Sequence, residues 1–149
     1  MLYFVDREKI EEILTYIDKI LQEFDGNSFN SPLEKLSLER LVHMLIESTL
    51  DIGNMMIDGF IMRDPGSYED IIDILIDERV LPQEQEGAYK EFIGLRKSLV
   101  TEYSNVDHES LEKTLRASLP VLEKFSLHIS EYLQNELGVA NAFIPHDKV

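Results

Sequence analysis

Apolar residues recur every three or four positions along most of this chain, whereas strict alternation of apolar and polar residues is nearly absent. The first spacing lines one face of an α-helix with apolar side chains, and the second is typical of a β-strand. The chain therefore predicts an all-α fold of about five helices. The first helix is expected between a cap at Asp6 and a stop at Gly26. Its apolar face comprises Ile10, Ile13, Leu14, Ile17, Leu21 and Phe24.

The segment Ser31-Pro32-Leu33-Glu34 carries a strong helix-start signal. Its serine is a good cap, its proline suits the first helical position, and its glutamate can bond back to the cap. The helix that begins here is expected to extend to about Met62. Pro120 falls inside the fifth helix and removes a backbone donor, so a kink or short break is expected there. The other boundary signals are a turn at Asp64-Pro65-Gly66, caps at Ser67 and Asp107, a helix start at Pro82 and a helix end at Gly138.

The chain has 149 residues, of which 44% are apolar and 29% charged, as in an ordinary globular protein. This length fits one domain over 1–149, with a tail from about 139 onward. No apolar run is long enough to span a membrane, the first residues do not resemble a secretory signal, and there is no cysteine. The absence of cysteine excludes disulfides and thiolate metal sites. Together these observations lead us to expect a cytoplasmic location without membrane contact.

The formal net charge of −15 limits the partners that the chain can bind, because 29 acidic residues face 14 basic ones. Proteins that follow long stretches of nucleic acid gain affinity from a basic surface, so the acidic charge argues against that function. A local pocket with one or two arginines can still hold a phosphate. A basic protein partner is equally compatible with this charge.

The most specific motif is Arg96-Lys97-Ser98-Leu99-Val100-Thr101-Glu102-Tyr103, late on the expected fourth helix. On a continuous helix Tyr103 lies on the same stripe as Arg96, while Thr101 lies about 140° around from it. A site that joins position 101 to Arg96 therefore needs a loosened helix end or a second subunit. The buried side of this helix is expected to comprise Ala88, Phe92, Leu95, Leu99 and Tyr103.

The motif resembles the signature Arg-x-x-x-x-His-x-Tyr of the HepT-like family in the HEPN superfamily, especially its YutE-like branch. Thr101 stands where the family has histidine, and Lys97 stands where it often has asparagine. The resemblance extends from about Leu36 to Leu133. It rests on the order and spacing of further fragments, namely Leu38-Glu39-Arg40, Ile52-Gly53-Asn54, the segment 64–70, Val80-Leu81-Pro82 and Val106-Asp107.

The resemblance implies an antiparallel HEPN-type helical bundle and a homodimer in which the motifs of two protomers face one cleft. It also implies the toxin of a toxin–antitoxin module, a metal-independent endoribonuclease that cleaves RNA through the 2′-hydroxyl. In this interpretation Arg96 holds the phosphate, and Tyr103 accepts AMP from a small partner nucleotidyltransferase, the antitoxin. The hydroxyl of Thr101 lacks the basicity of imidazole, so the active site is expected to be degenerate.

Other interpretations of the same residues stay open. Arg96 can equally be a helix arginine that pairs with a nearby carboxylate, and Tyr103 an amphipathic ring at the edge of an interface. The chain can be a catalytically inactive homodimer that binds RNA or a nucleotide or regulates a partner, or a scaffold without a nucleotide role. His108 can supply the missing imidazole, although a capping or exposed histidine is the more common case.

A polar stripe follows one face of the expected second helix at spacings of three and four residues. Its ends are expected to be solvated, and its middle, from Glu47 to Asn54, to face the fourth helix. A half-buried guanidinium needs a counter-charge, so we expect Arg96 to approach Glu47 or Asp51. Repeated Glu-x-x-His ligand pairs are absent, so neither a metal nor another cofactor is expected. The stripe comprises His43, Glu47, Asp51, Asn54 and Asp58.

Overall fold

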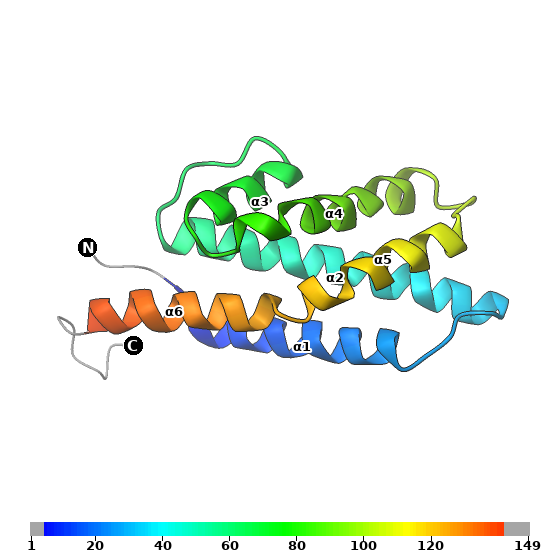
Figure 1. Ribbon diagram of the computed structural model, residues 1–149, viewed down its shortest axis with the longest axis horizontal. Helices are drawn as coiled ribbons and strands as arrows, with labels where there is room; N and C mark the ends of the chain where they lie inside the picture. Colours follow the sequence, from blue (N-terminus) through cyan, green and yellow to red (C-terminus); the bar gives the residue numbers. More distant parts are fainter. Residues whose placement is uncertain (1–4, 142–149) are drawn as a thin grey trace.

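The computed structural model describes residues 5–141, in which helices are joined by short connections and no β-strand occurs. The long α2 runs antiparallel to both α1 and α4, and α4 runs antiparallel to α5 (Figure 1). The predicted all-α antiparallel bundle is confirmed. The elements are α1 (Arg7–Asp25), α2 (Pro32–Gly59), α3 (Tyr68–Asp77), the 3₁₀-helix η1 (Gln83–Gln85), α4 (Glu86–Thr101), α5 (His108–Leu122) and α6 (Phe125–Asn141).

Local capping fixes where most helices begin. At the start of α2 the Glu34 N–H donates to the Ser31 hydroxyl at 3.1 Å, and the Ser31 N–H donates to Glu34 Oε1 at 2.8 Å. This reciprocal pair is the predicted capping box. α2 ends at Gly59, shortly before the predicted Met62, because Ile61 adopts a left-handed backbone with φ 56°. Side chains of all the predicted caps accept a first-turn N–H, namely Asp6, Ser31, Ser67 and Asp107.

The predicted fifth helix is divided into α5 and α6 by a short break between Leu122 and Phe125. Pro120 lies inside α5, just before this break, and the predicted kink is confirmed. α6 continues to Asn141, so Gly138 does not end it as predicted. Glycine ends a helix most readily in a left-handed conformation, and no described glycine has a positive φ. The rest of the predicted tail lies outside the described residues. Within residues 5–141, no helix combines the length and apolar character needed to cross a membrane.

Gly53 on α2 permits the close packing of α3. A Cβ atom at this position would lie 2.5 Å from Ile71 Cγ2 and 3.5 Å from Leu75 Cδ1. The first distance is too short for a real Cβ contact, so a larger residue would push the two helices apart. This close approach helps to fix α3 and therefore its first residue, Tyr68.

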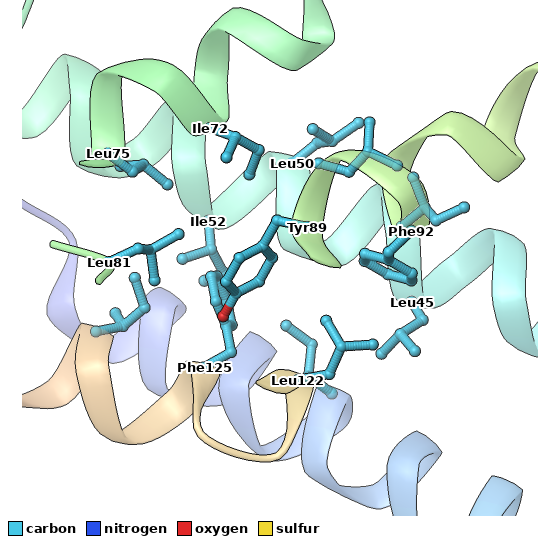
Figure 2. Close-up of a cluster of buried hydrophobic side chains, with 14 of the residues drawn as sticks. Leu45, Leu50, Ile52, Ile72, Leu75, Leu81, Tyr89, Phe92, Leu122 and Phe125 are labelled. Carbon is cyan, nitrogen blue, oxygen red and sulfur yellow. The ribbon is translucent and has the colours of Figure 1, made fainter. Parts of the chain in front are cut away.

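Tyr89 lies in the middle of the hydrophobic core, with Ile52 of α2, Leu75 of α3 and Phe125 of α6 around it (Figure 2). Its side chain is 0% exposed, and its ring meets that of Phe125 edge-on at 6.0 Å between centroids. The hydroxyl has no hydrogen-bond partner among the described residues. Burial raises the pKa of the Tyr89 phenol well above its ordinary value, so the group stays neutral.

The buried side of α4 agrees with its prediction except at one end. Phe92 and Leu99 are buried as predicted. The prediction of a buried Tyr103 is wrong, since this side chain is 72% exposed. α4 ends at Thr101, and the polar residues that follow form a turn into α5, so Tyr103 leaves the helical stripe. Half-buried positions on this side of α4 are Ala88 and Leu95.

Candidate functional site

Arg96 on α4 and Glu47 on α2 form the central contact of the candidate site. The Arg96 Nε–H donates to Glu47 Oε1 at 2.6 Å, and the two side chains are 26% and 31% exposed. The predicted approach of Arg96 to Glu47 or Asp51 is therefore confirmed at Glu47. This hydrogen bond raises the pKa of the Arg96 guanidinium above its ordinary value, which is already high. Glu47 thus fixes one edge of a permanently charged group.

The other edge of the Arg96 guanidinium is available to a ligand. Of its five donor hydrogens only that on Nε is used, and Nη1 and Nη2 make no hydrogen bond within residues 5–141. The guanidinium carbon lies 4.5 Å from the centroid of the Tyr68 ring, a cation–π distance. Glu47 and Tyr68 therefore orient the group and leave its terminal nitrogens for an anion. Arginine binds phosphate well in this way, through two parallel hydrogen bonds.

The turn between α2 and α3 positions Tyr68. Asp70 accepts hydrogen bonds of 2.8 Å from Arg63 Nη1 and Nη2 and another of 2.8 Å from the Gly66 N–H. The bond from Arg63, and after it that from Gly66, lowers the pKa of Asp70 to about 2. Ser67 in turn accepts from the Asp70 N–H at 3.0 Å. These bonds hold the first turn of α3, and with it the ring beneath Arg96.

His43 lies one helical turn before Glu47 on α2. Its Nε2 is 3.6 Å from the same Glu47 Oε1 that binds Arg96, and its side chain is 35% exposed. The sequence predicted a solvated position for His43, but it lies beside the arginine. The reason is that α4 crosses α2 near Glu47 and then runs toward the start of α2 (Figure 1).

The rest of the polar stripe does not join the site. Asp51 and Asn54 were predicted to face α4, but both are exposed. Their side chains make no hydrogen bond or ion pair with any other described residue. The prediction is therefore wrong for this part of the stripe. Asp58 is exposed too, as predicted for the end of the stripe.

His108, the first residue of α5, forms a second imidazole–carboxylate pair on the same face of α2. Its Nε2 lies 2.7 Å from Glu39 Oε2, and the two side chains are only 25% and 21% exposed. The expectation of an exposed or capping His108 missed this partner. The sequence shows only that Glu39, His43 and Glu47 follow one another at intervals of four residues on one helix face, and this spacing does not identify His108 as a partner.

Thr101 and Tyr103 lie away from these contacts. Thr101 is exposed, and its hydroxyl donates to the Lys97 carbonyl of its own helix at 2.7 Å. Among the described residues, no hydrogen bond, ion pair or cation–π contact joins Arg96 to Thr101 or Tyr103. The structure therefore brings Arg96 together with Glu47 and Tyr68 but not with the other two motif positions.

The chain has clear relatives among known proteins. Residues 10–129 match the family model described as ribonuclease HepT-like. The chain belongs to the ribonuclease HepT-like family. A relative from Bacillus subtilis (strain 168), described as "Putative RNase YutE", is 46% identical over 143 residues, which are 95% of this chain and 99% of the relative. A solved structure, titled "Structure of Cytosolic Protein of Unknown Function YutE from Bacillus subtilis", matches with a TM-score of 0.89 and 46% identity, covering 92% of this chain and 96% of that chain.

These similarities confirm the HepT-like resemblance and the HEPN-type bundle expected from the sequence. In this HepT-like chain the arginine of the motif is held by side chains outside the motif, from α2 and α3. Within residues 5–141 no three carboxylate or imidazole side chains come together as a possible metal site. The chemistry that the grouped residues can perform is phosphate binding by a guanidinium and proton transfer by a nearby imidazole.

Proposed function

We propose that this HepT-like protein is a metal-independent endoribonuclease in which Arg96 binds the phosphate of the RNA at the position of cleavage. The observation that carries the proposal is the state of the guanidinium. Glu47 and Tyr68 hold it on one edge and one face, and its two terminal nitrogens are unused by the other described residues. Membership of the ribonuclease HepT-like family gives this arrangement its expected substrate.

The acidic composition restricts the form of that substrate. A net charge of −15 repels a long polyanion, and counterion release from many phosphates is not available. A single oriented guanidinium can still bind one phosphodiester in a short or unpaired stretch of RNA. The proposed enzyme therefore acts locally on such segments and does not follow long RNA.

The motif positions Arg96, Thr101 and Tyr103 by themselves predict a slow reaction. Loss of general acid–base assistance typically lowers a rate by about 10²–10⁴-fold, and a threonine hydroxyl cannot provide it. The Thr101 hydroxyl is in addition bonded to the Lys97 carbonyl. This bond favours the second candidate function, a catalytically inactive homodimer that binds RNA or a nucleotide or regulates a partner.

A role as the toxin of a toxin–antitoxin module belongs to the same proposal. Tyr103 is 72% exposed in the turn after α4, which supports its role as an acceptor of AMP from a minimal nucleotidyltransferase antitoxin. Incubation with ATP and a nucleotidyltransferase encoded beside this protein should add AMP, seen by mass spectrometry. The addition should disappear in Tyr103→Phe and persist in Tyr16→Phe, which removes another exposed tyrosine. Modification that is unchanged in Tyr103→Phe contradicts this role.

Assembly as a two-fold homodimer, with α4 at or beside the interface, completes the proposal. Val100 and Tyr103 leave apolar surface exposed at the end of α4, and this exposure supports the arrangement. Light scattering at tens of micromolar protein should give the mass of a dimer. The mass of a monomer at that concentration contradicts the homodimer.

RNA cleavage by the purified protein, together with growth after induced expression, tests the activity. Arg96→Ala should lower the cleavage rate by about 10²–10³-fold, as for loss of a group that stabilises transition-state charge. Arg7→Ala, which removes an arginine from an exposed pair on α1, should leave the rate unchanged. Thr101→His should raise cleavage or toxicity, and Arg96→Ala should abolish that gain. Equal rates for the wild type and Arg96→Ala contradict the proposed ribonuclease and favour the inactive homodimer.

A further inference from the structure

Arg96 and His43 share a single carboxylate oxygen. Arg96 Nε lies 2.6 Å and His43 Nε2 lies 3.6 Å from Glu47 Oε1. A guanidinium and an imidazole that approach the same oxygen lie close enough for one nucleotide to reach both. The imidazole is 35% exposed, so it is accessible from the surface.

We propose that His43 is a catalytic residue of this protein and supplies the imidazole that the motif lacks at Thr101. The proposal rests on the ribonuclease function proposed above and names the group that transfers the proton. A phosphodiester bound by the free terminal nitrogens of Arg96 brings the neighbouring ribose toward His43. Glu47 lies beside both groups, so its carboxylate faces the imidazole ring that accepts the proton.

The reaction is a transesterification that needs no oxidant and no further reactant. Neutral His43 accepts the proton of the ribose 2′-hydroxyl, and the 2′-oxygen attacks phosphorus. The bond from phosphorus to the 2′-oxygen forms while the bond to the 5′-oxygen of the next nucleotide breaks. The departing 5′-oxygen takes a proton from solvent, and His43 later returns its own proton to solvent. The products are a 2′,3′-cyclic phosphate and a 5′-hydroxyl end.

The other described histidines fit this role less well. The Nε2 of His108 is already engaged by Glu39 at 2.7 Å, and this pair joins α5 to α2 one turn away from His43. His128 lies on α6, and its Nδ1 is buried without a hydrogen-bond partner among the described residues. Neither residue shares a carboxylate with Arg96. His108 and His128 therefore provide controls of the same residue type.

Replacement of each histidine by glutamine tests the assignment, because glutamine keeps a polar side chain but cannot accept the proton. His43→Gln should lower the rate of RNA cleavage by about 10²-fold or more. His108→Gln and His128→Gln should stay within about threefold of the wild type, with melting curves used to confirm that each variant is folded. In the Thr101→His background, His43→Gln should have little effect, because the new histidine then provides the base.

The outcomes separate this inference from the function on which it rests. If Arg96→Ala abolishes cleavage while His43→Gln cleaves like the wild type, the role of His43 is overturned and the ribonuclease stands. If His108→Gln removes the activity in place of His43→Gln, the assignment is also overturned. A wild type that does not cleave RNA overturns both proposals.

Binding gives a second measurement that does not depend on turnover. The probe is a dinucleoside monophosphate whose 2′-hydroxyl is replaced by hydrogen, so that it binds without being cleaved. Its addition should shift the ring signals of His43 in NMR spectra, with His43→Gln identifying those signals. Arg96→Ala should remove the shift, and the signals of His128 should not move. Unchanged His43 signals at saturating probe overturn the proposal.

Discussion

The polar groups of α4 differ in whether they have a partner, depending on whether they lie in the core or at its edge. In the core, the Tyr89 hydroxyl is buried without a hydrogen-bond partner among the described residues. At the edge, the Arg96 guanidinium pairs with Glu47 at 2.6 Å and lies over Tyr68. Burying a neutral hydroxyl without a partner costs about 1–3 kcal/mol in proteins, whereas an unpaired charge costs more. Packing of the core offsets the cost of burying the Tyr89 hydroxyl, whereas the Arg96 guanidinium needs a charged partner.

This difference distinguishes residues that hold the fold from residues that hold the site. The core of α4 consists of large apolar or aromatic side chains such as Phe92 and Tyr89, which are fully buried. The edge consists of charged side chains that are a quarter to a third exposed, and these contribute little to folding. Substitutions in the core should therefore change stability, and substitutions at the edge should change ligand binding.

The largest effect on stability is expected from Phe92→Ala. Phe92 is fully buried between α4 and α2, and the truncation leaves a cavity. The free energy of unfolding should fall by about 3–5 kcal/mol, as measured by urea denaturation. Glu91→Ala on the exposed side of the same helix is the control, with a change near zero. Equal destabilisation by the two variants would mean that the α2–α4 contact is not the core.

Gly53→Ala should have the next largest effect. The added Cβ lies 2.5 Å from Ile71 Cγ2, so α3 must shift, and the free energy of unfolding should fall by about 1–3 kcal/mol. Gly94→Ala is the matched control, because its Cβ meets nothing within 4 Å. That variant should be stabilised by about 1 kcal/mol through helix propensity alone. Destabilisation by both alanines would contradict the close approach at Gly53.

Tyr89→Phe should act in the opposite direction. It removes the unpartnered hydroxyl and keeps the ring, so the free energy of unfolding should rise by about 1 kcal/mol. The midpoint of thermal or urea unfolding measures this rise. Tyr16→Phe, which alters an exposed tyrosine on α1, should change neither midpoint. A loss of stability in Tyr89→Phe would reveal a partner for the hydroxyl in solution.

Glu47→Gln should have the smallest effect on stability, below about 1 kcal/mol, because the pair with Arg96 is partly exposed. Its effect on binding should be larger, since the carboxylate orients the guanidinium. Affinity for the 2′-deoxy dinucleotide, measured by calorimetry, should change several-fold. Glu12→Gln, which alters an exposed pair on α1, should change neither quantity. Unaltered affinity in Glu47→Gln would contradict this orienting role.

The fold was predictable because its signals are local. The capping box at Ser31 and the cap at Asp107 depend on residues within one helical turn, and both are observed. The end of α2 at Gly59 depends on the left-handed backbone of Ile61, which apolar spacing does not reveal. The full burial of Tyr89 depends on packing from α2, α3 and α6, so it too was missed.

The candidate site was only partly predictable because its contacts join distant parts of the chain. The need of Arg96 for a carboxylate pointed to Glu47 or Asp51, and Glu47 is the observed partner. Tyr68 lies beneath the guanidinium because the turn before α3 and the start of α3 place it there. The spacing of residues in the sequence does not show that this part of the chain lies next to α4. The Glu39–His108 pair spans 69 residues, and only the crossing of α2 with α5 brings it together.

The first and last helices are far apart in the sequence but lie side by side in space, because α6 packs along α1 (Figure 1). Ser126 Oγ donates to Asp18 Oδ1 at 2.9 Å near this contact. Most other contacts join helices close in sequence, an arrangement that favours rapid folding. Closing α6 onto α1 requires the longest loop, so we expect it to follow the main barrier. Weakening it by Ser126→Ala should therefore speed unfolding and leave the folding rate almost unchanged.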